Sequence, residues 1–177
     1  MTRHLLEEAI AIRRAQANDR AAIWRILEPV LRAGETYALP RDMSRREALA
    51  YWMGKDRETF VAVDSGEVVG TYYIRANQQG GGAHVCNCGY VTATRSAGRG
   101  IAHSMCLHSL DYALRKGFRA MQFNFVVSTN ERAVRLWQSM GFDIIGRLPG
   151  AFAHPTRGYV DALVMHLEFA PGSQVVA

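Results

Sequence analysis

The sequence has no apolar run of eighteen or more residues, so it predicts no membrane-spanning helix. Among its 21 basic residues only Lys55 and Lys116 are lysines, and the arginines are scattered along the chain. It lacks the basic helix or basic–aromatic ribbon that is typical of nucleic-acid-binding proteins. The net charge of +5 therefore indicates a polyanionic small ligand as a sufficient partner, and not a nucleic acid.

Cysteine is scarce, and no set of cysteines and histidines has the spacing of a zinc site. Cys86 and Cys88 lie two residues apart on a predicted strand, where a disulfide between them would be strained. These features predict reduced structural thiols and no metal. The first residues carry acids and lack the apolar centre of a secretory signal, so we expect a cytoplasmic protein.

The chain of 177 residues has no repeats and no linker, which predicts one domain spanning 1–177. Hydrophobic periodicity and turn residues predict an α/β domain of order β-α-α-β-β-β-α-β-α-β-β. The predicted strands are 10–15, 59–64, 68–75, 83–93, 120–127, 142–147 and 159–169. The predicted helices are 21–31, 44–54, 101–117 and 130–140, and Pro29 is expected to end or kink the first of them. We expect loops at 78–82 and 148–158.

The stretch from Cys88 to Ala102 joins the central strand to the longest predicted helix through a glycine-rich turn. A helix N-terminus presents unpaired main-chain N–H groups and the positive end of the helix dipole, and both favour an anion. Arg99 lies inside the turn and could add positive charge. The pattern therefore predicts a phosphate site at the start of this helix.

This turn resembles the Gln/Arg-x-x-Gly-x-Gly/Ala motif of the GNAT superfamily of acyl-CoA N-acyltransferases, which cradles the pyrophosphate of acetyl-CoA. Residues 95–100 fit the bare pattern, whereas 97–102 place the following helix better because Ile101 and Ala102 then open it. We prefer the second register. It puts Ala97 where the family has Gln or Arg, which removes one side chain but no main-chain donor.

A second motif, at 130–142, is similar to the family's Asn-x-x-Ala-x-x-x-Tyr-x-x-x-Gly-Phe. The resemblance implies that Asn130 contacts the pantetheine arm of acetyl-CoA. The family's Tyr often protonates the departing thiolate, but Trp137 stands at that position, and an indole N–H is not a usable acid at neutral pH. Trp137 is expected to pack against pantetheine or to fill the core.

The resemblance implies the GNAT fold, a mixed sheet of about seven strands, antiparallel in its first half, with flanking helices and a splay between its fourth and fifth strands. In that fold, main-chain N–H groups of the fourth strand bind pantetheine and polarise the thioester carbonyl. The resemblance therefore implies acetyl-CoA as the acyl donor, bound by Tyr90, Val91, Thr92, Gly98, Arg99, Gly100, Ile101, Ala102, His103, Asn130 and Trp137.

Segments 87–91 and 124–130 are similar to those of fungal enzymes that N-acetylate azetidine-2-carboxylate and related proline analogues. The tail at 158–163 is similar in those enzymes and in phosphinothricin acetyltransferases. The resemblance implies that Asn87 and Asn124 hold the carboxylate and amine of the acceptor. Each has a structural alternative, since a buried amide such as the one expected at Asn124 needs a hydrogen-bond partner wherever it lies.

The loop between the first two helices, where the family shapes its acceptor pocket, contributes Glu35, Thr36 and Tyr37, and a solvated loop is the alternative. His84, His154 and Asp161 are the remaining candidates for a general base, each with a structural alternative. None of these residues settles the base, so the amine could lose its proton through water.

The expected function is N-acetylation of a small-molecule amine, a small amino acid or a toxic amino-acid analogue, by direct attack in a ternary complex. The alternatives are another amine acceptor, namely a polyamine, an antibiotic or a protein N-terminus, and a CoA-binding regulatory module without turnover. A multiply charged amine favours an acidic pocket, and the loop offers one carboxylate, that of Glu35. The fold is often dimeric, so a homodimer is one expected state.

Overall fold

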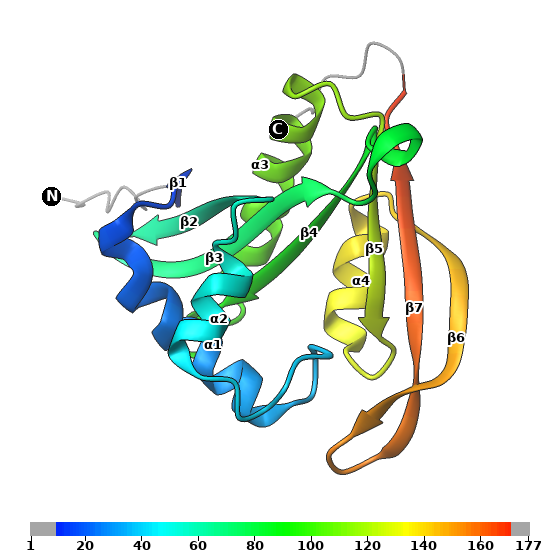
Figure 1. Ribbon diagram of the computed structural model, residues 1–177, viewed down its shortest axis with the longest axis horizontal. Helices are drawn as coiled ribbons and strands as arrows, with labels where there is room; N and C mark the ends of the chain where they lie inside the picture. The colour runs from blue at the N-terminus through cyan, green and yellow to red at the C-terminus, as the bar shows by residue number, and fades with distance from the viewer. Residues whose placement is uncertain (1–9, 171–177) are drawn as a thin grey trace, which may run out of the picture.

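The computed structural model describes residues 10–170, so residues 1–9, on which the prediction of no secretory signal depends, lie outside the described range. One seven-stranded sheet has the order β1-β2-β3-β4-β5-β7-β6, and four helices flank it (Figure 1). The strands are β1 (Ala11–Arg14), β2 (Glu58–Asp64), β3 (Glu67–Ala76), β4 (Val85–Thr92), β5 (Ala120–Val127), β6 (Asp143–His154) and β7 (Gly158–Glu168). The helices are α1 (Arg20–Ala33), α2 (Arg45–Trp52), α3 (Ile101–Arg115) and α4 (Glu131–Ser139). The predicted order of elements is confirmed.

The start of α2 follows from its sequence. The Ser44 hydroxyl accepts a hydrogen bond from the main-chain N–H of Glu47, and the Glu47 carboxylate accepts one from the N–H of Ser44. This reciprocal pair is the predicted capping box, and it fixes where the helix begins.

Pro29 lies inside α1 and does not end it, so the first of the two predicted outcomes, an end at Pro29, is wrong. A proline removes the hydrogen bond to the carbonyl four residues earlier, but α1 buries Ile23, Ile26, Leu27 and Leu31 against the sheet. This packing carries the helix one further turn. The helix then stops at Gly34, whose φ of 64° is left-handed.

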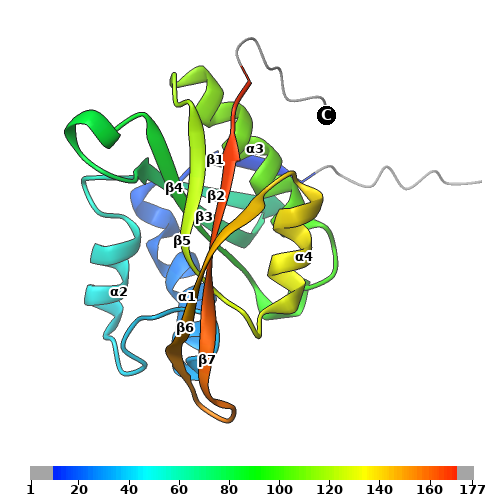
Figure 2. The ribbon, with the colours of Figure 1, turned by 90° about the vertical axis from the view of Figure 1, so that its right-hand side faces the viewer.

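The helices cover the two faces of the sheet in pairs. Buried residues of α1 and α2 share one apolar cluster with Tyr73 of β3 and Val91 of β4. Buried residues of α3 and α4 share the other cluster with the opposite faces of β3, β4 and β5. Figure 2 shows α2 and α4 on opposite sides of the sheet. We call these the α1/α2 face and the α3/α4 face.

Strands β4 and β5 are parallel but pair only at Val85–Ala120 and Cys86–Met121. Beyond these two pairs the strands diverge, and the gap between their ribbons is visible in Figure 1. On its other edge β5 pairs antiparallel with β7, with a register irregularity between Phe123 and Val126. The predicted splay between the fourth and fifth strands is therefore confirmed.

Two predicted loops contain regular structure. Strand β6 continues through most of 148–158 and pairs with β7 as far as His154–Gly158, so the predicted loop there is wrong. A register shift between Leu148 and Phe152 accommodates the proline and glycine that suggested a turn. Residues Gly80–Gly82 form one turn of 3-10 helix.

No helix within 10–170 is both long and apolar enough to cross a membrane.

Candidate active site

A cavity of about 720 Å³ lies where β4 and β5 separate, and it reaches from the first turn of α3 to the loop after α1. Of the cofactor residues implied by the resemblance, the structure brings ten to its wall: Tyr90, Val91, Thr92, Gly98, Gly100, Ile101, Ala102, His103, Asn130 and Trp137. Of the predicted acceptor residues, four line it: Thr36, Tyr37, Asn87 and Asn124. Arg99 and Glu35 do not, and Glu35 is exposed to solvent.

One edge of β4 faces this cavity. On the other edge, the N–H of Ala93 donates to the Val69 carbonyl and the N–H of Asn77 donates to the Val85 carbonyl, each at 2.8 Å. In an antiparallel pair these bonds alternate along the strand, so the odd-numbered residues of β4 bond to β3. The main-chain groups of Cys88, Tyr90 and Thr92 therefore point to the edge that β5 has left. N–H groups on such an edge can donate to a ligand carbonyl.

The first turn of α3 forms a cradle of main-chain donors. Gly98 and Gly100 have φ of 85° and 75°, left-handed values that glycine adopts without steric cost. The first intrahelical bond runs from the N–H of Ser104 to the Gly100 carbonyl at 2.9 Å. The N–H groups of the three residues in between therefore have no helical partner and can bind a phosphate.

The cation at this cradle is Arg132, which sequence reasoning missed. It lies in the first turn of α4 and lines the cavity, and a Cβ built at Gly98 would lie 3.7 Å from its Nη2 atom. Within 10–170, Arg132 forms no ion pair. The guanidinium of Arg99 instead binds Asp64 at 2.6 Å, because the turn directs it toward the end of β2. The sequence feature that could have identified Arg132 is its position at a helix start, two residues after Asn130.

Trp137 is both a core residue and part of the cavity wall. Its ring centroid lies 5.0 Å from that of Tyr90 and 5.0 Å from that of Phe123, and it is buried. Both expected uses of Trp137 are thus compatible with its position. Asn130 caps α4, since its side-chain oxygen accepts from the N–H of Ala133 at 3.4 Å.

Asn87 extends the pairing of the two diverging strands by one step. Its side chain is buried, and its Nδ2 donates to the Gln122 carbonyl at 2.9 Å, just beyond the last Cys86–Met121 pair. The amide thus has a structural bond, while its side-chain oxygen forms no hydrogen bond within the described residues. That oxygen is available to accept a hydrogen bond from a ligand.

Asn124 is exposed, so the expectation of a buried amide is wrong. It lies in the irregular part of β5, next to Phe123, whose ring packs on the α3/α4 face. The side chain of Asn124 reaches the α1/α2 face, because it bonds to Asn77, whose position four residues after Tyr73 puts it on that face. Its Nδ2 donates to Asn77 Oδ1 at 2.6 Å, and its Oδ1 accepts from Gln122 at 2.9 Å.

Tyr37, Tyr51 and Tyr73 line the α1/α2 side of the cavity. Sequence reasoning predicted only Tyr37 as a site residue. Tyr37 donates its hydroxyl to the Tyr90 carbonyl at 2.9 Å. Burial raises the pKa of Tyr37 and of Tyr73, so both phenols keep their protons at neutral pH. The Tyr73 ring lies across Gly89, where an added Cβ would be 2.7 Å from Cε1.

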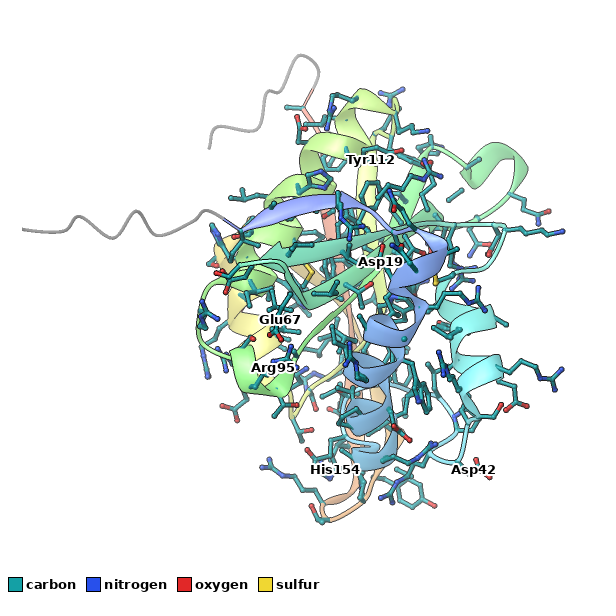
Figure 3. All side chains as sticks on the ribbon, turned by 90° about the vertical axis from the view of Figure 1, so that its left-hand side faces the viewer. Asp19, Asp42, Glu67, Arg95, Tyr112 and His154 are labelled. Atoms are coloured by element: carbon teal, nitrogen blue, oxygen red, sulfur yellow. The ribbon has the colours of Figure 1, made fainter. Side chains whose placement is uncertain are left out.

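The candidate bases from the sequence lie outside the cavity wall. His84 bonds to the Gly81 carbonyl at 3.1 Å. His154 ends β6 near the tip of the β6–β7 hairpin (Figure 3) and accepts from the N–H of Thr156 at 3.2 Å. Asp161 pairs with Arg147 at 2.7 Å. Each of the three therefore has a local structural bond.

The charges on the cavity wall have one sign. Arg75 and Arg132 line it, and no Asp or Glu among residues 10–170 does. Nor do the described residues contain a group of three or more His, Cys, Asp or Glu side chains placed to hold a metal. The wall therefore suits an anionic ligand at both the α3 end and the β3 end.

Burial raises the pKa of the Cys88 thiol, which also lines the cavity. A thiol with a raised pKa is a poor nucleophile, because the thiolate is the reactive form. A long cavity with a phosphate cradle, free main-chain donors and, among residues 10–170, no thiolate on its wall fits a phosphate-bearing thioester.

Comparisons with known proteins agree with this fit. The family model described as Acetyltransferase (GNAT) family matches residues 5–142. N-acetyltransferase aca1 of Schizosaccharomyces pombe is 30% identical, in an alignment that covers 77% of this chain and 73% of that protein. A GCN5-related N-acetyltransferase from Kribbella flavida is 43% identical with a TM-score of 0.87, over 92% of this chain and 99% of its own.

The same fold occurs in YncA of Salmonella typhimurium, whose structure holds its cofactor acetyl-CoA. It is 21% identical, with a TM-score of 0.81 over 95% of this chain and 98% of its own. The chain therefore belongs to the GNAT acetyltransferase family and is an N-acetyltransferase with acetyl-CoA as its acyl donor.

Proposed function

We propose that the acceptor is a small amino acid or a toxic amino-acid analogue, acetylated on its amine by direct attack in a ternary complex. The observation that carries this proposal is the charge of the cavity wall, which within 10–170 includes two arginines and no carboxylate. A polyamine or an aminoglycoside carries several positive charges, and such an acceptor would be repelled from this wall. An amino acid brings a carboxylate that the wall can attract.

The donor is assigned to the α3 side of the cavity. The N–H groups of Ile101, Ala102 and His103, with Gly98 and Gly100, are proposed to hold its pyrophosphate. Arg132 supplies the positive charge that the sequence had assigned to Arg99. Asn130 and Trp137 are proposed to contact the pantetheine arm, because both line the cavity between the cradle and β4.

The open edge of β4 is proposed to polarise the thioester. The main-chain N–H groups of Tyr90 and Thr92 point into the gap between the strands and are fixed before any ligand binds. Fixed donors of this kind stabilise the negative charge that develops on a carbonyl oxygen during attack. Bound acetyl-CoA supplies an activated acetyl carbonyl and a thiolate leaving group.

Direct transfer is supported by the lack of a thiolate on the cavity wall within residues 10–170. Cys88 is the cysteine that lines the cavity, and its raised pKa keeps it protonated. The acceptor amine must therefore attack the thioester itself. Asn87 and Asn124 are proposed to orient the acceptor from the α1/α2 face. Thr36 and Tyr37, in the loop after α1, are proposed to complete the acceptor pocket.

The amine is proposed to lose its proton to water. No Asp or Glu within the described range lines the cavity, and its one histidine, His103, lies in the α3 cradle. Tyr37 and Tyr73 have raised pKa values and hold their protons at neutral pH, so they cannot serve as bases. We further propose that residues 1–177 act as one cytoplasmic domain that detoxifies amino-acid analogues.

Thiol release from acetyl-CoA, measured across amino acids, azetidine-2-carboxylate, phosphinothricin, polyamines and aminoglycosides, tests this function. We expect turnover with one or more of the amino acids or analogues. Tight CoA binding with no turnover on any acceptor would favour a regulatory module, and turnover confined to the polycations would refute the assigned acceptor class.

A further inference from the structure

We propose that Arg75, held in place by Asp56 and backed by Arg57, binds the carboxylate of the acceptor. This inference rests on the proposed function, because it names the group that recognises the amino acid. Arg75 lines the cavity, whereas Asp56 and Arg57 lie behind it in the loop between α2 and β2. The motifs that led to the family contain none of the three.

The position of Arg75 places it on the acceptor side of the sheet. Arg75 of β3 is directly opposite Asn87 of β4 in the antiparallel register, so their side chains share a face. Tyr73 occupies the same face two residues earlier and packs in the cluster with α1 and α2. Asn124 points to this face from across the gap. Arg75 thus lies beside Asn87, on the face that Asn124 reaches, and not beside the phosphate cradle.

The two cationic ends of the cavity are well separated. From Asn87, opposite Arg75, to Thr92, at the end of β4 that leads to α3, the strand advances about 16 Å at the usual rise per residue. Arg132 lies at the α3 end. One ligand phosphate cannot engage both arginines, so Arg75 has a different anion to bind.

Arg57 fixes the geometry from behind. Its side chain is only 8% exposed, and its Nε and Nη2 atoms donate to the two Asp56 oxygens at 2.9 and 3.0 Å. Its guanidinium also lies over the rings of Tyr51 and Tyr73, at 4.7 and 4.8 Å from their centroids. Such cation–π contacts hold a buried guanidinium in one orientation.

Asp56 joins the two arginines. Its Oδ2 atom also accepts from Arg75 Nη1 at 3.2 Å, and hydrogen bonding to Arg57 lowers the pKa of Asp56 to about 2. The carboxylate is therefore ionised at neutral pH. Two guanidinium groups share this one carboxylate, which leaves the cluster with one uncompensated positive charge.

The cluster also has unused donors. Arg57 Nη1 and Arg75 Nε are buried and form no hydrogen bond within the described range. Arg75 Nη2 likewise has no protein partner there, and Arg75 is part of the cavity wall. The Arg75 side chain is 32% exposed, so water reaches part of it, but its buried Nε atom still lacks an acceptor, and an unbonded buried donor is costly. A ligand carboxylate at Arg75 would supply the missing charge and the missing acceptor.

The test compares each amino acid that the enzyme accepts with its carboxamide, which keeps the amine and loses the negative charge. The variants are Arg75→Gln, Arg75→Lys and the control Arg115→Gln, which removes an exposed arginine paired with Asp111 on α3. For each enzyme the ratio of kcat/KM for acid over amide is measured. This ratio does not depend on the amount of folded enzyme, and the difference in amine basicity cancels between variants.

We expect Arg75→Gln to lower the acid-to-amide ratio by about 10- to 100-fold, the range for a hydrogen bond to a charged group. KM for acetyl-CoA should not change, and Arg115→Gln should keep the wild-type ratio. If Arg75→Gln does not fold, the acid-to-amide ratio of Arg75→Lys tests the assignment. We expect it to lower the ratio several-fold, because lysine keeps the charge but not the planar fork.

An equal loss on acid and amide in Arg75→Gln, or an unchanged ratio in Arg75→Lys, would overturn the assignment of Arg75 as the carboxylate ligand. A raised KM for acetyl-CoA at constant ratio would assign Arg75 to the donor instead. Failure of the proposed function looks different, because the wild-type enzyme itself would then not turn over any amino acid.

Discussion

The hydroxyl of Tyr37 donates a 2.9 Å hydrogen bond to the main-chain carbonyl of Tyr90. This bond ties the loop after α1, which shapes the acceptor side of the cavity, to the open edge of β4. The same strand edge carries the N–H groups that we assign to the thioester. The two substrates therefore meet at one strand, and the position of the acceptor loop depends on that strand.

Replacing Tyr37 with Phe removes this bond and leaves the Tyr90 carbonyl without its side-chain partner. We expect the free energy of unfolding to fall by about 1 kcal/mol, a typical net value for one hydrogen bond. KM for the acceptor should rise more than KM for acetyl-CoA. Urea denaturation and initial-rate kinetics measure both effects. Tyr159→Phe is the matched control, because Tyr159 is 82% exposed. Equal increases in both KM values would refute a role confined to the acceptor loop.

Arg132→Gln tests the donor end of the cavity. Loss of a charged hydrogen-bond donor to phosphate should raise KM for acetyl-CoA about 10-fold, and the difference from wild type should shrink as salt is added. Arg135→Gln changes the same helix at an exposed arginine paired with Glu131, and it should leave KM for acetyl-CoA unchanged. If Arg135→Gln has the larger effect, the phosphate site does not include Arg132.

Gly89→Ala tests the floor of the acceptor pocket. The added Cβ would lie 2.7 Å from Tyr73 Cε1, and the Tyr73 ring cannot move freely because it packs edge-on against Tyr51 and Trp52. We expect a loss of stability of about 1–3 kcal/mol, the range for overpacking. The acceptor KM should rise as the ring shifts into the cavity. Gly81→Ala is the control, because it adds a methyl group in open space and, like Gly89, Gly81 does not have a left-handed φ. An unchanged acceptor KM in Gly89→Ala would show that Tyr73 does not contact the acceptor.

The pH dependence of the reaction should follow the acceptor. The pKa of Tyr37 and that of Tyr73 are raised above their ordinary value near 10. Neither phenol therefore ionises as the pH rises from 6 to 9. The logarithm of kcat/KM should then rise by about one per pH unit until the pKa of the acceptor amine is reached. Acceptors with less basic amines should reach their plateau at lower pH. If kcat/KM instead stops rising at the same pH for every acceptor, the titrating group is a base on the enzyme.

Local sequence signals predicted much of the fold. The capping box of Ser44 and Glu47 marked the start of α2, and the glycines before Ile101 marked the start of α3. These signals depend on residues that are close in sequence, where spacing alone fixes which groups can bond. The main error in the strands, the predicted loop at 148–158, came from a proline and a glycine that the register shift of β6 accommodates.

The site was less predictable where it depends on contacts between distant residues. The turn places Arg99 against Asp64 on β2, and α4 brings Arg132 to the cradle, which no local pattern determines. Asn124 is exposed on the wall of the cavity that opens where β4 and β5 separate, so a count of apolar neighbours in the sequence misjudged its burial. The pairing of Asp56 with Arg75 joins a loop to a strand nineteen residues later.

The central claim is that the cavity selects an anionic amine for acetylation, and a competition experiment tests it most directly. The enzyme is given limiting acetyl-CoA with equal concentrations of an amino acid, its carboxamide and spermidine, and the products are quantified by mass spectrometry. The product ratios equal the ratios of kcat/KM. We predict that the N-acetyl amino acid predominates and that acetylspermidine is the least abundant product. A mixture dominated by acetylspermidine would contradict the claim.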